Sequence, residues 1–294
     1  MALNNIVRLG YIAARSTLKN EMLYASPSTA HEIYKLPVVV FFGGDVQDYP
    51  ENMTAHRDHG KYVEWSLTST TSLLANKFPA CHILVVKPSR MERKTFSCYD
   101  NFVVSNSVGA PTHDPGIKAV THLIDLILEG LKKATEVNQE SENPSFSPPN
   151  SISLDAVDDI TLIGFSKGCV VLNQLIIEFR GLSVIEKLGD GDLHKFMEKI
   201  HNMYWLDGGH AGGSQTWITD SPVLNSLASQ KHININVQVT PYQVEDEQRP
   251  WIKRECKMFC KILQRAGCQI KYQLHSSDEP PSLFIHFRLL NEFT

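Results

Sequence analysis

One ten-residue stretch, ITLIGFSKGC at 160–169, restricts the folds open to this chain more than any other part of the sequence. It starts with a short apolar run rich in β-branched residues, which favours a buried strand. After Cys169, large apolar residues recur at helical spacing, at Leu172, Leu175, Ile176 and Phe179. The stretch is therefore predicted to be a strand that turns sharply, at a serine, into a helix.

That serine, Ser166, has Gly164 and Gly168 two positions to either side. The arrangement is typical of the nucleophile elbow of α/β-hydrolases, where the turn from strand to helix is too tight for flanking Cβ atoms. The three-letter pattern is a weak signal by itself, so the strand before it and the helix after it carry the interpretation. The alternative is an ordinary turn serine between two core elements.

Strand-like and helix-like patterns alternate along the rest of the chain. Strands are expected at 36–42, 81–86, 160–163, 203–206, 233–239 and 269–274, and helices at 62–78, 118–133, 170–179, 192–200, 223–229, 251–266 and from 286. This order predicts an α/β fold, with a mostly parallel sheet covered by helices on both faces. Only about 25 residues separate the strands near 207 and 233, so no large cap domain is expected.

Of the 294 residues, 42% are hydrophobic and 20% charged, which is enough to bury the core of one α/β domain, expected over 36–294. A flexible insertion is predicted within it at about 134–158, where Asn, Gln, Ser, Glu and Pro dominate. Two interpretations remain open for 1–35. It is either a basic amphipathic helix of the mitochondrial import type, or it contains a first strand at Ile6 to Ile12.

Several classes of protein are not expected. A formal net charge of -4 leaves no basic face for nucleic acid, and no apolar run approaches the roughly 18 to 20 residues of a membrane-spanning helix. The six cysteines form no C-x-x-C pair and are interpreted as reduced core thiols. Cys256 and Cys260 lie one helical turn apart without histidines at zinc-finger spacing, so neither a metal site nor a cofactor is predicted.

In a hydrolase with such an elbow, the serine attacks a carbonyl carbon, a histidine takes its proton and an acid orients the histidine. The chain order is serine, acid, histidine, with the acid after the second strand beyond the elbow and the histidine after the last strand. Asp246 and His286 occupy those places. Two alternatives end strands, namely Asp207 for the acid and His275 for the histidine.

Further residues are predicted around this site. Gly44 or Asp45, in the glycine-bearing turn after the strand at 36–42, would donate one backbone N–H to the oxyanion, and Lys167 would donate the second. The side chain of Lys167 is expected to reach solvent. His210, in the glycine-rich turn at 207–213, is a candidate for the pocket wall, and the long segment 87–116 for its roof.

Five strings of residues resemble one poorly characterised animal family, the chromosome 2 open reading frame 69 family of α/β-hydrolase-like proteins. They are FFGGDVQ at 41–47, SCYDNF at 97–102, LIGFSKGCVVLNQ at 162–174, YWLDGGH at 204–210 and VTPYQV at 239–244. The resemblance implies a mitochondrial address. It also implies that the family's serine, post-strand acid and terminal histidine fall on Ser166, Asp246 and His286. No established substrate comes with it.

The leading hypothesis is a serine hydrolase of the mitochondrial matrix that cleaves an ester or thioester of a small acyl or lipid substrate. A cytoplasmic location is the alternative address. Two alternative functions also remain open at this point. One is a catalytically silent scaffold that binds a protein partner, and the other is an acyltransferase with the same triad.

Overall fold

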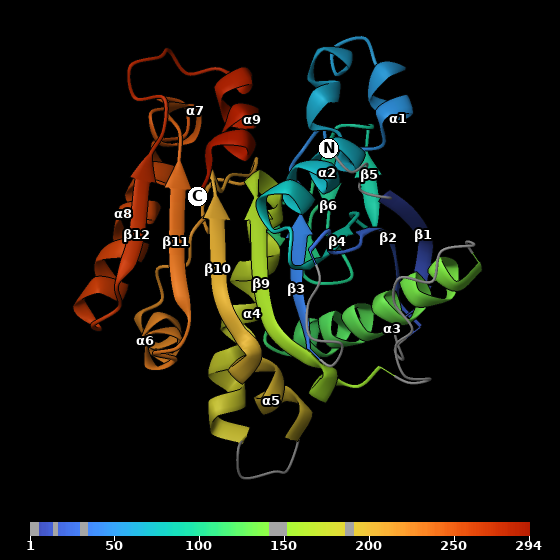
Figure 1. Ribbon diagram of the computed structural model, residues 1–294. Coiled ribbons are helices and arrows are strands. Elements are labelled where there is room, and N and C mark those ends of the chain that lie inside the picture. Colours follow the sequence, from blue (N-terminus) through green and yellow to red (C-terminus); the bar gives the residue numbers. More distant parts are fainter. Residues whose placement is uncertain (1–5, 14–16, 30–34, 141–151, 186–190) are drawn as a thin grey trace.

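The centre of the structure, a computed structural model that describes residues 6–13, 17–29, 35–140, 152–185 and 191–294, is an eight-stranded sheet (Figure 1). Its strand order is β1-β2-β4-β3-β9-β10-β11-β12. β2 runs antiparallel to both β1 and β4, and all other neighbours are parallel. The strands are β1 (Ile6–Ala13), β2 (Lys19–Ala25), β3 (Leu36–Phe42), β4 (His82–Val86), β9 (Val157–Phe165), β10 (Ile200–Leu206), β11 (Asn234–Val239) and β12 (Ile270–Leu274).

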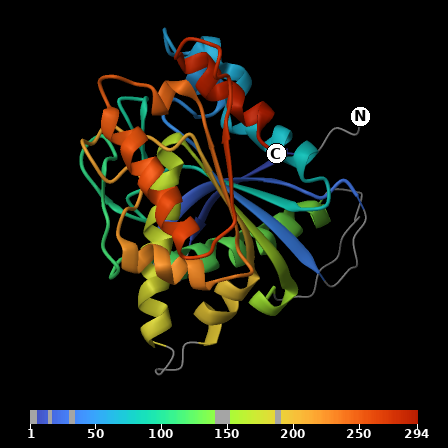
Figure 2. The same ribbon diagram turned by 90° about the vertical axis from the view of Figure 1, so that its left-hand side faces the viewer.

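Helices cover both faces of this sheet, as the view in Figure 2 shows. One buried cluster joins the sheet to α3 (Ala119–Glu140), α4 (Cys169–Ile185), α5 (Gly191–Lys199), α6 (Ser221–Ser229), α7 (Pro241–Val244) and α8 (Pro250–Arg265). The other joins it to α1 (Pro50–Thr54), η1 (Gly60–Trp65), α2 (Leu67–Lys77) and α9 (Leu283–Glu292). The predicted α/β fold, with a mostly parallel sheet and helices on both faces, is confirmed.

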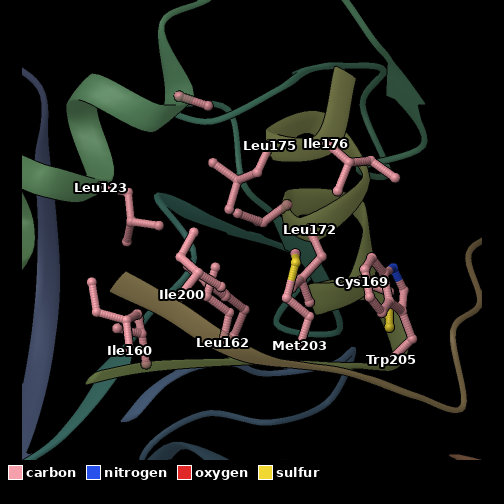
Figure 3. Close-up of a cluster of buried hydrophobic side chains, with 14 of the residues drawn as sticks. Leu123, Ile160, Leu162, Cys169, Leu172, Leu175, Ile176, Ile200, Met203 and Trp205 are labelled. Carbon is pink, nitrogen blue, oxygen red and sulfur yellow. The ribbon is translucent and has the colours of Figure 1, made fainter. Parts of the chain in front are cut away.

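The two central strands, β3 and β9, are almost wholly buried. The predicted strand at 36–42 is confirmed with the same bounds. Its continuous run of Val and Phe suits a parallel strand that helices cover on both sides. Figure 3 shows how β9 and β10 pack beneath α4, with Met203 below Leu172 and with Ile160 below Leu123 of α3. The elbow helix is therefore fixed to the middle of the sheet.

Segment 87–116 is more ordered than its sequence predicts. It contains two small hairpins, β5 (Arg90–Glu92) with β6 (Phe96–Cys98) and β7 (Val104–Ser105) with β8 (Pro111–Thr112). Between them, the Tyr99 hydroxyl donates a hydrogen bond to the Gly43 carbonyl (2.9 Å), and the Phe102 ring packs edge-on against Phe42 (5.4 Å between centroids). The segment is thereby anchored to the end of β3, beside the predicted oxyanion turn.

Two regions differ from their predictions. The strand interpretation of 6–12 is confirmed by β1, which pairs with β2, a strand that was not predicted because polar and apolar residues do not alternate along it. The helix expected to end at 133 continues to Glu140, and β9 starts at Val157. Both ends of the expected insertion are thus part of the fold, while 141–151 lie outside the described residues, as do 1–5 and 14–16.

Within the part of the chain that the structure describes, no helix combines the length and the apolar character that crossing a membrane requires.

Candidate active site

Ser166 lies where β9 ends and the short η3 turn (Ser166–Gly168) leads into α4. Its φ of 53° is in the left-handed region, which non-glycine residues seldom occupy and which stores strain. The residue is almost fully buried, at 6% exposure. A serine with a left-handed backbone between a parallel strand and a helix is the arrangement that a nucleophile elbow requires.

The glycines around this turn are there because of close packing. A Cβ on Gly164 would lie 2.2 Å from Cδ1 of Leu172, and one on Gly168 would lie 2.0 Å from the carbonyl oxygen of Phe42. Neither position has room for a side chain. Gly44 is equally close to the serine itself, since its Cβ would lie 2.5 Å from Cβ of Ser166. The turn after β3 therefore runs against the serine.

His286 supplies an imidazole on the same edge of the sheet. It lies in the first turn of α9, where the Ser282 side chain caps the helix by accepting the Ile285 N–H (3.3 Å). Its ring stacks on Phe165, the residue before the serine (4.5 Å between centroids), and Tyr242 lies 4.8 Å away. Figure 1 shows α9 above the C-terminal ends of the central strands, where sites of open α/β sheets form.

The acid that contacts His286 is Asp207. Its Oδ2 lies 2.6 Å from Nδ1 of His286, and both side chains are buried. Because an ionised carboxylate only accepts hydrogen bonds, this contact assigns a proton to Nδ1, and in the neutral imidazole Nε2 is then the ring nitrogen that can accept a proton. This is the tautomer that a general base next to a serine requires.

Thr240 holds Asp207 from the neighbouring strand end. Its backbone N–H donates to Oδ1 of Asp207 (2.8 Å), and its hydroxyl donates to Oδ2. Sequence reasoning did not identify Thr240, although a threonine directly after β11, at the place where the acid was expected, is a signal that could have been used. The acid that contacts His286 thus follows β10, one strand earlier than predicted. Thr240, a hydrogen-bond donor to that acid, follows β11, where the acid was expected.

The prediction of Asp246 as the acid therefore needs correction. Asp246 lies beyond α7 on the surface, where it accepts hydrogen bonds from Nε of Arg249 (2.6 Å) and from the backbone N–H of Gln248 (2.8 Å). Partial burial raises the pKa of Asp246, but these hydrogen bonds outweigh burial and hold it below its ordinary value. The short helix α7 carries the chain away from His286 before Asp246 is reached.

Of the three predicted oxyanion donors, Gly44 is already engaged, because its N–H donates to Oε1 of Gln47 (2.9 Å). Gln47 is buried and is fixed in turn by a bond from its Nε2 to the Trp65 carbonyl (2.7 Å). The N–H groups of Asp45 and Lys167 remain as the candidate pair. They belong to two turns, one after β3 and one after β9, which Gly44 and Ser166 bring into contact.

The side chain of Lys167 does not reach solvent as expected. It is wholly buried, donates to the Val108 carbonyl (2.7 Å) and forms an ion pair with Oδ1 of Asp45 (3.0 Å). Burial raises the pKa of Asp45, and the charges of Lys167 and His286 oppose that shift. The reason is the segment 87–116, which folds over Lys167 and closes off the solvent.

The two other histidines singled out from the sequence have hydrogen-bond partners other than His286 and Asp207. Nδ1 of His210 accepts the Gly212 N–H (3.0 Å) in the glycine-rich turn, and burial lowers the pKa of His210 to about 4. Nε2 of His275 contacts Oε1 of Gln238 (2.8 Å), and its Nδ1 lies 3.5 Å from Glu292. Both His275 and His286 thus face a carboxylate, and His286 is the one whose ring stacks on Phe165, beside Ser166.

Comparison with known proteins agrees with the resemblance noted in the sequence. A family model described as C2orf69 matches residues 8–156 and 129–269. The mitochondrial protein C2orf69 homolog of Danio rerio is 41% identical over 255 residues, which cover 87% of this chain and 72% of the relative. The mitochondrial protein C2orf69 of Homo sapiens is 40% identical over 293 residues, which cover 87% of this chain and 74% of the relative.

Among solved structures, a ferulic acid esterase superposes with a TM-score of 0.50 at 12% identity, covering 99% of this chain and 96% of the esterase. At that identity the likeness concerns the fold alone, and the fold is that of the α/β-hydrolases.

Proposed function

The chain belongs to the C2orf69 family, and we propose that its α/β-hydrolase fold carries a serine hydrolase that cleaves an ester or thioester of an acyl or lipid substrate. The observation that carries the proposal is the buried contact of 2.6 Å between His286 and Asp207, with the His286 ring stacked on Phe165, the residue before the strained Ser166. Strain, burial and a fixed histidine tautomer together are the combination that nucleophilic catalysis requires.

In the proposed reaction, Oγ of Ser166 attacks the acyl carbon while Nε2 of His286 takes the serine proton. The carbonyl oxygen becomes an oxyanion and accepts hydrogen bonds from the backbone N–H groups of Asp45 and Lys167. The intermediate collapses when the leaving alcohol or thiol takes the proton from His286. Water then attacks the acyl-serine with His286 again as the base, which releases the acid and restores Ser166. Asp207 stabilises the imidazolium in both halves.

An acyl or lipid substrate is favoured by the surroundings of the histidine. Phe165, which is fully buried, and Tyr242, which is partly exposed, place aromatic rings beside His286. The exposed part of the Tyr242 ring is a surface that binds hydrocarbon chains better than charged groups.

The proposed location of the protein is the mitochondrion. Fractionation of cells that express the tagged chain tests this location. The support is that the relatives from Danio rerio and Homo sapiens are named mitochondrial proteins. The chain should resist added protease in intact mitochondria and lose that protection when detergent opens both membranes. Recovery in the cytosolic fraction would argue against this location.

A fluorophosphonate probe tests the activity, because it forms a covalent bond only with an activated serine. The wild-type chain should be labelled, Ser166→Ala should not, and Ser229→Ala, which removes an exposed hydroxyl on α6, should be labelled like wild type. An unlabelled wild-type chain, or labelling that survives Ser166→Ala, would refute the hydrolase and favour a scaffold without activity.

A further inference from the structure

Asp45 and Lys167 are joined by their side chains as well as by the role proposed for their backbone N–H groups. The ammonium of Lys167 is wholly buried and lies 3.0 Å from Oδ1 of Asp45, whose side chain is 27% exposed. A buried lysine carries a large desolvation cost, which a hydrophobic residue of similar size would avoid. A buried ion pair next to the nucleophile therefore calls for an explanation other than stability.

The pair belongs to a wider set of contacts that fixes the turn at Gly44 and Asp45. Gln47 accepts the Gly44 N–H, while the Ser97 hydroxyl donates to the Gly44 carbonyl (2.6 Å). The Ser97 N–H donates to the same Asp45 oxygen that faces Lys167 (2.8 Å). These contacts hold the turn to its own surroundings, whereas the ion pair of Asp45 with Lys167 ties the turn to the elbow through side chains.

The turn and the elbow cannot easily be tied in any other way. Gly44, which touches Ser166, has no side chain and no room for one. The N–H groups of Asp45 and Lys167 have to stay free for the substrate oxygen in the proposed reaction. A link between the two donor residues must therefore come from their side chains, and an ion pair supplies it at a defined distance.

We propose that the Asp45–Lys167 ion pair is a positioning device that sets the spacing of the two oxyanion donors. Hydrogen bonds to an oxyanion stabilise the transition state only when the donors lie about 2.7 to 3.1 Å from the developing charge. The bond from Lys167 to the Val108 carbonyl extends the device to the segment 87–116. Lys167 and Asp45 thus act through their backbone groups, and the inference rests on the proposed function.

The test compares Lys167→Met, Asp45→Asn and the double variant, with kcat and KM measured on a p-nitrophenyl acyl ester and Tm measured in parallel. All three should lose about 10- to 100-fold in kcat, with KM within about twofold of wild type, because the lost interaction acts in the transition state. Lys199→Met is the matched control. Lys199 also donates to a backbone carbonyl, that of Val157, but it lies at the opposite edge of the sheet.

The three variants should rank differently in Tm than in kcat. Asp45→Asn leaves a buried ammonium without its counter-charge and should lower Tm most. Lys167→Met leaves a partly exposed carboxylate that can take up a proton, and the double variant removes both charges, so these two should fold. If the pair served stability alone, kcat would follow Tm, and the double variant would regain wild-type kcat. That result would overturn the inference.

The probe experiment separates this inference from the proposed function. A wild-type chain that resists the fluorophosphonate refutes the hydrolase, and the positioning role falls with it. A labelled wild-type chain whose double variant reacts at the same rate leaves the hydrolase intact and refutes the positioning role alone.

Discussion

Asp207 combines a left-handed backbone with a carboxylate that accepts three hydrogen bonds. Its φ of 47° lies in the left-handed region, and its N–H is held by the Gln238 carbonyl (2.7 Å). Thr240 donates two hydrogen bonds to the carboxylate and His286 donates the third. With this backbone conformation, the carboxylate of Asp207 contacts His286 in α9. The acid therefore follows β10, whereas the sequence predicts an acid after β11.

Asp207→Asn and Asp246→Asn should therefore differ in their effect on kcat. Asp207→Asn should lower kcat by about 10³- to 10⁴-fold on an activated ester, because an amide at this place favours the wrong tautomer of His286. Asp246→Asn should change kcat less than twofold, since Asp246 accepts its hydrogen bonds from Gln248 and Arg249 on the surface beyond α7. Loss of activity in Asp246→Asn, with Asp207→Asn active, would restore the acid expected from the sequence.

Local pattern and chain order single out Ser166 and His286 as candidates, and the structure places both at the C-terminal ends of the central strands. The acid depends on which strand end approaches α9, and that is a tertiary contact with no local signal. The same reason explains Lys167. A lysine in a turn is usually solvated, and only the folding of residues 97–109 over it makes it buried. Strands and helices with continuous apolar patterns are predicted well, while β2, with mixed polarity, is not.

Among the secondary-structure elements, the turn between β9 and α4 depends on a glycine, because a Cβ atom at Gly168 would overlap the backbone of β3. The chain has to reverse between β9 and α4 while α4 stays in contact with the end of β3. The Cβ that Gly168 lacks would lie 2.0 Å from the Phe42 carbonyl oxygen and 2.9 Å from the Gly43 carbonyl oxygen. Those are backbone atoms of a central strand, which cannot move aside as a flexible side chain would.

Two glycine substitutions on consecutive elements test this account. Gly168→Ala should lower the free energy of unfolding by about 3 kcal/mol or more in urea, because the new methyl group overlaps rigid backbone. Gly181→Ala, in α4, meets no atom within 4 Å and should raise it by about 0.5 to 1 kcal/mol through helix propensity. Equal effects of the two substitutions would show that the elbow tolerates a side chain.

At the scale of the whole molecule, acid stability depends on histidines buried without charge. Burial lowers the pKa of His113, His122 and His210 to about 4 in each case. They lie in the segment before α3, in α3 itself and in the turn after β10, so their titration affects separate parts of the fold. In the unfolded chain each histidine has a pKa near 6.5.

Stability should therefore fall as the pH is lowered from about 6.5 to 4. In that window the unfolded chain binds more protons than the folded one, so the free energy of unfolding rises with pH. Each histidine contributes at most about 3 kcal/mol of this change. Urea denaturation at several pH values measures the slope, and His122→Gln should show a smaller slope than wild type. Identical slopes in the two proteins would contradict the assignment of His122 as a buried neutral group.

The central claim is that Ser166, His286 and Asp207 act together as one catalytic unit. The most direct measurement is the intact mass of the chain during reaction with a fluorophosphonate, followed by peptide mapping of the adduct. The account predicts one adduct per chain, located on Ser166, forming quickly in wild type and in Asp246→Asn and at least about 100-fold more slowly in Asp207→Asn. An adduct on another residue, no adduct, or equal rates in wild type and Asp207→Asn would contradict it.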